Sequence, residues 1–173
     1  ISITLFYSFL SKLTVNNPEI QVVIIAGNHD SAIRLEMPIP LLSNTKIKII
    51  GHVKKKDDKS IDFGALTIPL RNKGGEIEIF CLAIPFLRIG DYPKNEKGVY
   101  EYSYGVSQFY KQAFENISNI KKINQSIIAM GHLHAMGVET DLEDTAERPI
   151  IGGVENINTN SFSEDLKYVA LGH

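Results

Sequence analysis

The sequence has few of the features that mark several common classes of protein. It contains one cysteine, Cys81, which argues against a disulfide scaffold and predicts a buried, reduced thiol in a reducing, cytoplasmic compartment. No stretch approaches the roughly 18 apolar residues of a membrane-spanning helix, and no signal peptide is visible. The formal net charge of -2 excludes a protein that grips nucleic acid by bulk positive charge. A nucleic-acid substrate is still compatible with this charge, because bound divalent cations can supply local positive charge.

The sequence contains alternating helical and strand patterns, which predict an α/β fold. The 173 residues are 43% hydrophobic, which is enough for one domain with a sizeable core. The expected helices cover 3–13, 31–42 and 106–120, and the expected strands cover 22–26, 47–50, 61–70, 76–84, 127–130, 150–152 and 168–171. Pro38 and Pro40 must end or distort the second helix. The Asn-Lys-Gly-Gly sequence at 72–75 predicts a hairpin, and therefore antiparallel strands.

Three apolar runs end in a glycine that is followed by a side chain able to bind a metal. These runs lie in the segments 22–30, 127–134 and 168–173. Short apolar runs bounded by turn signals are typical of buried strands, and ligands of open α/β sheets gather beyond the carboxyl ends of such strands. We therefore expect these segments to meet in space although they are far apart in sequence.

The Gly27-Asn28-His29-Asp30 sequence carries the first candidate site residues. Asn28 offers a neutral carbonyl oxygen that suits a hard or borderline divalent ion, and His29 can ligate a metal or act as an acid near neutral pH. Taken alone, the four residues are also compatible with a polar turn and a helix N-cap. The other two strand-Gly-His segments make that alternative weaker.

Four segments together carry a family resemblance: Val23–Ser31, Ala83–Arg88, Ile128–Leu133 and Tyr168–His173. They resemble the calcineurin-like metallophosphoesterases and, within that superfamily, the SbcD-type nuclease subunits of bacteria. The Asn-His-Asp motif alone identifies only the superfamily, whereas the ordered set with Pro-Phe-Leu-Arg is typical of the nuclease branch. The resemblance implies mixed β-sheets packed as a sandwich flanked by helices, in a single metallophosphoesterase domain over residues 1–173.

The resemblance also implies roles for individual residues. Asn28, His132 and His173 would be ligands of one metal ion. His29 would not be a ligand but would face the scissile phosphate and stabilise or protonate the departing oxygen. Asp30 would orient the His29 ring, and a helix N-cap is an equally good interpretation of this residue.

Two further histidines follow glycines or ligand-like residues, and both are interpreted as non-ligands. His134 imitates the second histidine of a Gly-His-x-His motif, but His173 fits the later element that carries this pair in SbcD-type sequences. His52 follows a strand and Gly51, but it has no counterpart in the family pattern and is interpreted as a surface histidine.

The family's opening Asp-x-His and Gly-Asp-x-x-Asp motifs would precede Ile1, and the second histidine of the closing pair would follow His173. We therefore expect an internal fragment, truncated at both ends and lacking the first strands of the fold. It would hold three ligands of one metal and the catalytic histidine, and would be inactive by itself.

For the complete protein, the resemblance implies hydrolysis assisted by two divalent metal ions, with Mn²⁺ expected, although iron or zinc would also suit these ligands. It implies 3′-to-5′ exonuclease activity on duplex DNA and endonuclease activity on hairpins, in DNA repair, recombination and replication. The implied partners are DNA, an SbcC-type ATPase and a second copy of the chain, as a homodimer within a heterotetramer.

Two other functional classes stay open. One is another calcineurin-like phosphodiesterase acting on a nucleotide or phosphoprotein, which would not need the Ala83–Arg88 segment. The other is a non-catalytic assembly module that docks on an ATPase. Natural loss of the metals would normally erode the candidate site residues together, whereas all of them are intact here.

Overall fold

The computed structural model describes residues 3–133, 135–136, 157–158 and 162–172 of the chain. The helical elements are α1 (Ile3–Asn16), α2 (Ala32–Glu36), the 3-10 helix η1 (Ile39–Leu42) and α3 (Tyr102–Ser118). The strands are β1 (Val22–Ile25), β2 (Ile47–Ile50), β3 (Thr67–Arg71), β4 (Ile77–Ala83), β5 (Ser126–His132), β6 (Ala135–Met136), β7 (Ile157–Asn158) and β8 (Leu166–Gly172).

The strands form two main sheets. The first is the parallel pair β1-β2, and the second has the order β3-β4-β5-β8, while β6 and β7 form a separate short pair. In the larger sheet β3 runs antiparallel to β4, and β4, β5 and β8 are parallel to one another. The predicted mixed α/β fold is therefore confirmed.

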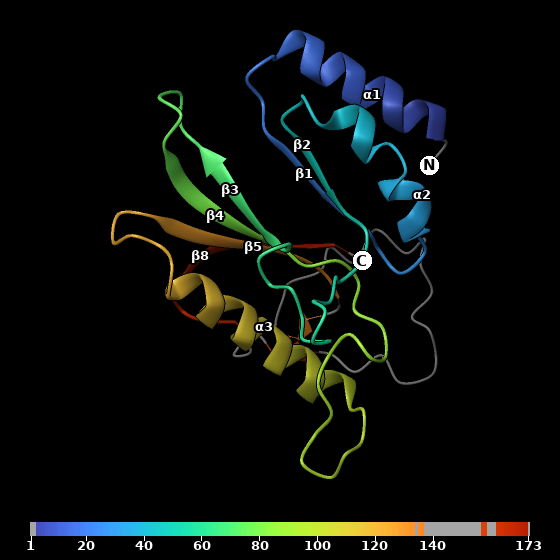
Figure 1. Ribbon diagram of the computed structural model, residues 1–173, viewed down its shortest axis with the longest axis vertical. Helices are drawn as coiled ribbons and strands as arrows, with labels where there is room; N and C mark the ends of the chain where they lie inside the picture. The colour runs from blue at the N-terminus through green and yellow to red at the C-terminus, as the bar shows by residue number, and fades with distance from the viewer. Residues whose placement is uncertain (1–2, 134, 137–156, 159–161, 173) are drawn as a thin grey trace.

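The two main sheets pack face to face, and helices cover both outer faces (Figure 1). Successive side chains of a strand point to opposite faces, so each sheet has an inner and an outer apolar side. The inner layer consists of Val23, Ile25, Ile50, Ile68, Leu70, Cys81, Ala83, Ile128 and Met130. The other side of β1-β2 packs on α1 and α2, and the other side of the larger sheet packs on α3. This is the sandwich flanked by helices that the resemblance implies.

The helices begin and end where local chemistry dictates. Ser31 caps α2, because its Oγ accepts a hydrogen bond from the Arg34 N–H (3.4 Å). The helix stops before Pro38, and the chain continues as η1, in which Pro40 is accommodated. The sequence predicted this distortion of the 31–42 helix.

One predicted strand is shorter than expected, and others differ. The strand expected from residue 61 begins only at Thr67, because the Asp62 side chain accepts the Ala65 N–H (3.1 Å) and holds a turn there. The short strands β6 and β7 were not expected, and the strand expected at 150–152 lies outside the described residues.

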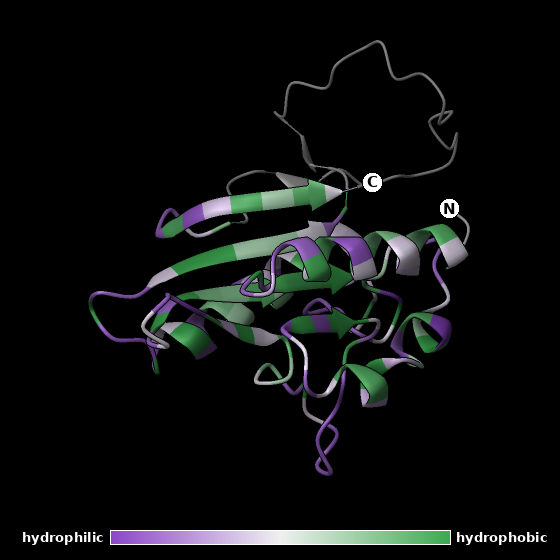
Figure 2. Ribbon diagram, turned by 90° about the horizontal axis from the view of Figure 1, so that it is seen from above, coloured by the Kyte–Doolittle hydropathy of each residue, from purple (hydrophilic) through white to green (hydrophobic). Residues whose placement is uncertain are grey.

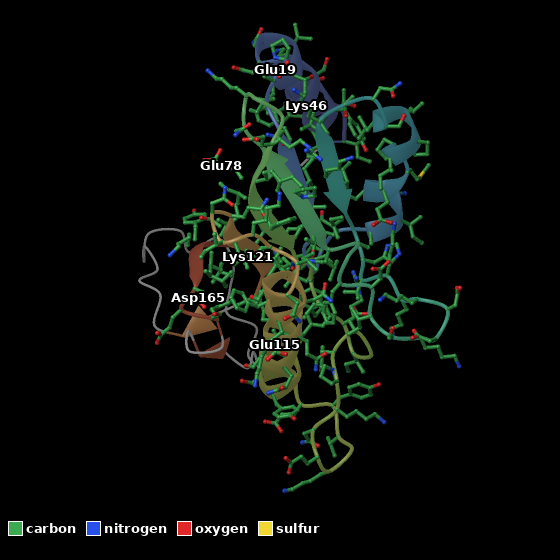
Figure 3. The ribbon with its side chains drawn as sticks, turned by 60° about the vertical axis from the view of Figure 1, so that its left-hand side comes forward. Glu19, Lys46, Glu78, Glu115, Lys121 and Asp165 are labelled. Atoms are coloured by element: carbon green, nitrogen blue, oxygen red, sulfur yellow. The ribbon has the colours of Figure 1, made fainter. Side chains whose placement is uncertain are left out.

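Hydrophobic residues dominate the strands, whereas the loops are largely hydrophilic (Figure 2). Charged side chains lie on the outside, and Glu19 and Lys46 pair at the amino ends of β1 and β2 (Figure 3). Their side chains are 86% and 46% exposed, so the pair contributes at most about 1 kcal/mol. Within the described residues, no helix is long and apolar enough to cross a membrane.

Cys81 lies in the inner layer between the sheets and is 1% exposed. It is a free thiol, and burial raises its pKa to about 11. A neutral thiol is a poor nucleophile, so Cys81 serves packing rather than chemistry. The predicted buried, reduced cysteine matches this environment.

Gly131 of β5 and Tyr110 of α3 make a close contact on the outer side of the larger sheet. A Cβ at position 131 would lie 2.0 Å from Tyr110 Oη, so only glycine fits. The Tyr110 hydroxyl is fully buried and has no hydrogen-bond partner among the described residues, and burial raises its pKa. The residue before His132 is thus fixed by an aromatic side chain of the helix layer.

We predict that Gly131→Ala lowers the free energy of unfolding by about 1–3 kcal/mol, because the new methyl group overpacks against Tyr110. Tyr110→Phe is expected to be neutral or stabilising, since it removes a buried hydroxyl that lacks a partner. In the Tyr110→Phe background, Gly131→Ala should cost less. Urea unfolding of the two single variants and the double variant measures this coupling, and purely additive losses would contradict it.

Candidate metal centre

The two main sheets are joined at the carboxyl ends of their strands. The Ile84 N–H donates to Met130 O (3.1 Å), but two residues later the Phe86 N–H donates to Ala26 O (2.9 Å). The chain after β4 therefore leaves β5 and pairs with the end of β1. The Ala26 N–H in turn donates to Ile50 O of β2 (3.0 Å). As the sequence predicts, strand ends that are far apart in the chain meet at one edge.

At this edge, side chains from the two sheets converge. Asn28 follows β1, His132 ends β5, and Asn28 Oδ1 lies 3.0 Å from His132 Nε2. Both residues are partly buried. With Nε2 protonated, the histidine donates a hydrogen bond to the amide oxygen; with Nε2 unprotonated, both atoms present lone pairs to the same region.

The position of the His132 ring is set by two glycines and one aromatic ring. A Cβ at Gly27 would lie 2.7 Å from His132 Cε1, so the ring rests directly on the glycine backbone. Gly172 of β8 pairs with His132 in the sheet register. The Phe86 ring meets the imidazole edge-to-face, with centroids 6.2 Å apart and planes at 82°. The imidazole is therefore held on several sides before any ligand binds.

The Asn28-His29 turn is fastened by Asp30. The Gly27 N–H donates to Asp30 Oδ2 (2.7 Å), and the Asp30 N–H donates to Gly27 O (3.3 Å). His29 and Asp30 are exposed. The helix N-cap is Ser31 rather than Asp30. The orientation of the His29 ring by Asp30 stays a prediction, whereas the carboxylate clearly shapes the turn that presents Asn28 and His29.

The other predicted ligand, His173, lies outside the described residues, as does His134. Gly172, which precedes His173 in the chain, lies beside His132. In the described part of the chain, no three His, Cys, Asp or Glu side chains gather in a way that could hold a metal ion. That observation does not count the amide of Asn28.

The donor set of Asn28 and His132 fits a divalent cation. An amide oxygen and an imidazole nitrogen are ligands that manganese, iron and zinc accept. Two ligand atoms at about 2.1 Å from one ion and at right angles to each other lie about 3.0 Å apart, as these two atoms do. The same two side chains come from different sheets, so the fold and not the local sequence brings them together.

Sequence reasoning did not identify two contributors to this site. Phe86 joins the sheets through its backbone and contacts His132 through its ring. Arg88 lies with Cζ 5.8 Å from the Phe86 ring centroid and is exposed, so it adds positive charge near the strand ends. The signal was the Pro-Phe-Leu-Arg sequence directly after an apolar run, whose structural role the sequence alone does not reveal.

Comparison with known proteins finds no matching family model, but it does find sequence relatives. The SbcD subunit of the SbcCD nuclease of Rhodobacter capsulatus is 35% identical over 98% of this chain, and that of Bacillus subtilis is 30% identical over 98%. The chain is similar to the SbcD subunits of SbcCD nucleases. The SbcD protein of Staphylococcus epidermidis is 28% identical over 90% of the chain. The resemblance to SbcD-type subunits is thereby confirmed.

The chain spans about two-fifths of the length of these SbcD relatives, covering 42%, 41% and 36% of them. The similarity runs through the strand ends that form the candidate metal centre, because it covers nearly all of the chain. Each relative is named a nuclease and a subunit of an SbcCD complex.

We predict that Gly27→Ala weakens binding of Mn²⁺ by about 10- to 100-fold, because the methyl group displaces the His132 ring. Gly172→Ala is the matched control, since a Cβ there would lie 3.6 Å from His132 Nδ1, an ordinary contact. Calorimetric titration of both variants measures the metal affinity, with circular dichroism to verify the fold. Equal affinities in the two variants would show that the ring position does not matter for the metal.

Proposed function

We propose that this chain provides part of the catalytic centre of a metal-dependent DNA nuclease subunit, with residues 1–173 belonging to a single metallophosphoesterase domain. The observation that carries the proposal is the convergence of Asn28 Oδ1 and His132 Nε2, 3.0 Å apart, beside the exposed His29. The names of the SbcD relatives supply the reaction class, which is phosphodiester hydrolysis.

In this proposal the residues have separate roles. Asn28, His132 and His173 hold one metal ion, and Gly27 leaves space for the His132 ring. Two divalent ions, when bound, supply Lewis-acid charge that activates a water and stabilises the charge of an in-line displacement. His29 is exposed at the tip of the turn, where it can give a proton to the departing oxygen.

The proposed metal is Mn²⁺, on the basis of oxygen and imidazole ligands without thiolates. The proposed substrate is DNA, cleaved as duplex ends and as hairpins, and the proposed partner is an SbcC-type ATPase. The SbcCD name that the relatives carry supports such a partner. A cytoplasmic location is proposed on the buried free thiol of Cys81.

The proposed homodimer is supported by an apolar stripe on the outer helices. Ile33, Met37 and Leu41 follow one another at intervals of four residues and are 77%, 71% and 85% exposed. Leu5 and Phe9 of α1 add side chains that are 63% and 59% exposed. Monomeric proteins rarely expose such contiguous apolar surface, and a self-complementary patch suits a two-fold dimer.

We predict that Leu41→Asp weakens the dimer of the full-length protein by at least about 30-fold, roughly 2 kcal/mol, because a charge would enter the apolar interface. Ile123→Asp is the control, as Ile123 is equally exposed but lies between α3 and β5, away from the stripe. Sedimentation analysis over a range of concentrations gives both dissociation constants. A dimer that tolerates Leu41→Asp as well as Ile123→Asp uses another surface.

The nuclease proposal is tested by Mn²⁺-dependent cleavage of a free-ended duplex and of a hairpin by the full-length protein. We predict that His29→Ala lowers kcat by about 100- to 10,000-fold while metal affinity is unchanged, because His29 acts on the leaving group and is not a ligand. Asn28→Ala is the comparison variant and is expected to lose metal as well as activity.

Unchanged turnover in His29→Ala would remove the proposed acid role. If the wild-type protein binds the metal but cleaves neither DNA substrate, another phosphodiester is the substrate and the nuclease assignment is wrong.

A further inference from the structure

A further strand-Gly-His sequence lies at the same edge as the candidate metal centre. His52 follows β2 and Gly51, and β2 is the parallel neighbour of β1. The last hydrogen bond between these strands joins the Ala26 N–H to Ile50 O (3.0 Å). Neighbouring strands lie about 4.8 Å apart, so Gly51 and His52 leave the sheet next to the segment that carries Asn28 and His29.

His52 is held by a carboxylate that also holds the backbone before it. Glu36 Oε1 accepts the Gly51 N–H (2.7 Å), and Glu36 Oε2 lies 2.9 Å from His52 Nδ1. A Cβ at Gly51 would lie 2.9 Å from Glu36 Cγ and 2.7 Å from Ala32 O, so the carboxylate reaches this position only because residue 51 is glycine. The Glu36 side chain is 15% exposed and that of His52 is 48% exposed.

This geometry fixes which ring nitrogen is available. Nδ1 faces Glu36, so Nε2, on the opposite side of the ring, is the atom left for a ligand. Among the described residues, Nε2 of His52 has no hydrogen-bond partner. In the ion-paired form both ring nitrogens carry protons, and the Nε2–H is a charge-assisted donor.

A purely structural role does not account for this arrangement. The Glu36 carboxylate already ties α2 to β2 through the Gly51 N–H, without any need for a histidine. A half-exposed ion pair adds at most about 1 kcal/mol to stability. A carboxylate that orients an imidazole toward solvent is, by contrast, the arrangement that positions a histidine for a ligand.

We propose that His52, oriented by Glu36, binds a phosphate oxygen of the substrate strand next to the scissile phosphate. This inference rests on the proposed function, because it takes a phosphodiester chain at this edge as the ligand. His52 would be a positioning residue: it contacts a phosphate that is not cleaved and sets the register of the strand over Asn28 and His29.

The test compares a polymeric and a small substrate in the full-length protein. His52→Asn keeps an amide N–H for Glu36 in place of Nδ1–H but removes Nε2. We expect it to raise KM for an oligonucleotide duplex about 10-fold with kcat unchanged, as for loss of one charged hydrogen bond. Hydrolysis of bis-p-nitrophenyl phosphate, which has no neighbouring phosphate, should be unchanged. Glu36→Gln, which frees the ring, should raise KM for the duplex in the same way.

A second arm locates the phosphate. Each phosphate near the cleavage point is replaced in turn by an uncharged methylphosphonate. One replacement next to the scissile phosphate should weaken binding to the wild-type protein and have no further effect in His52→Asn. An unchanged KM in His52→Asn, or equal losses on both substrates, would overturn the proposal.

The outcome is separable from that of the nuclease proposal. Anisotropy of a labelled duplex measures binding without cleavage, in the His29→Ala background. If the wild-type protein fails to cleave DNA, the nuclease proposal fails. Duplex affinity in His29→Ala with and without His52→Asn still decides the role of His52: about 10-fold weaker binding supports it, and equal binding overturns it.

Discussion

The hydrogen bond from the Phe86 N–H to Ala26 O joins the two sheets at the edge where the candidate site lies. A sandwich of two sheets is held mainly by apolar contacts, which fix the distance between the layers but are non-directional. The backbone bond adds a direction, because it makes the segment after β4 a neighbour of β1. The ends of β1 and β5 are thereby brought into register, and Asn28 meets His132 across the interface between the sheets.

Close backbone approaches then convert this register into a defined ring position. Gly27 lies under the His132 imidazole, and Gly131 lies against Tyr110, so the residues before Asn28 and before His132 both need the absence of a side chain. The two glycines act on opposite sides: Gly27 admits the ring, whereas Gly131 fixes the backbone that carries it. A ligand placed this way needs little reordering when a metal binds, which favours affinity.

Periodicity predicted most of the fold, because each buried strand is a short apolar run and each helix has one apolar face. β2 occupies the predicted residues, and the proline-broken helix appears as α2 followed by η1. The late start of β3 was missed, since it depends on the Asp62 side chain capping a turn. For the site, glycine-terminated strands predicted that Asn28 and His132 would meet. The part of Phe86 could not be predicted, because it depends on which strand the chain pairs with after β4.

Burial separates the histidines of this edge by role. His132 is partly buried and contacted by Gly27, Gly172 and Phe86, so its ring has one orientation, as a ligand requires. His29 is exposed at the tip of a turn that Asp30 fastens through the Gly27 amide, so its backbone is fixed while its ring can follow a substrate. A metal ligand benefits from rigidity, whereas a group that meets a leaving oxygen must adjust as the bond breaks. The same Gly27 serves both histidines, which explains why one short sequence after β1 carries both functions.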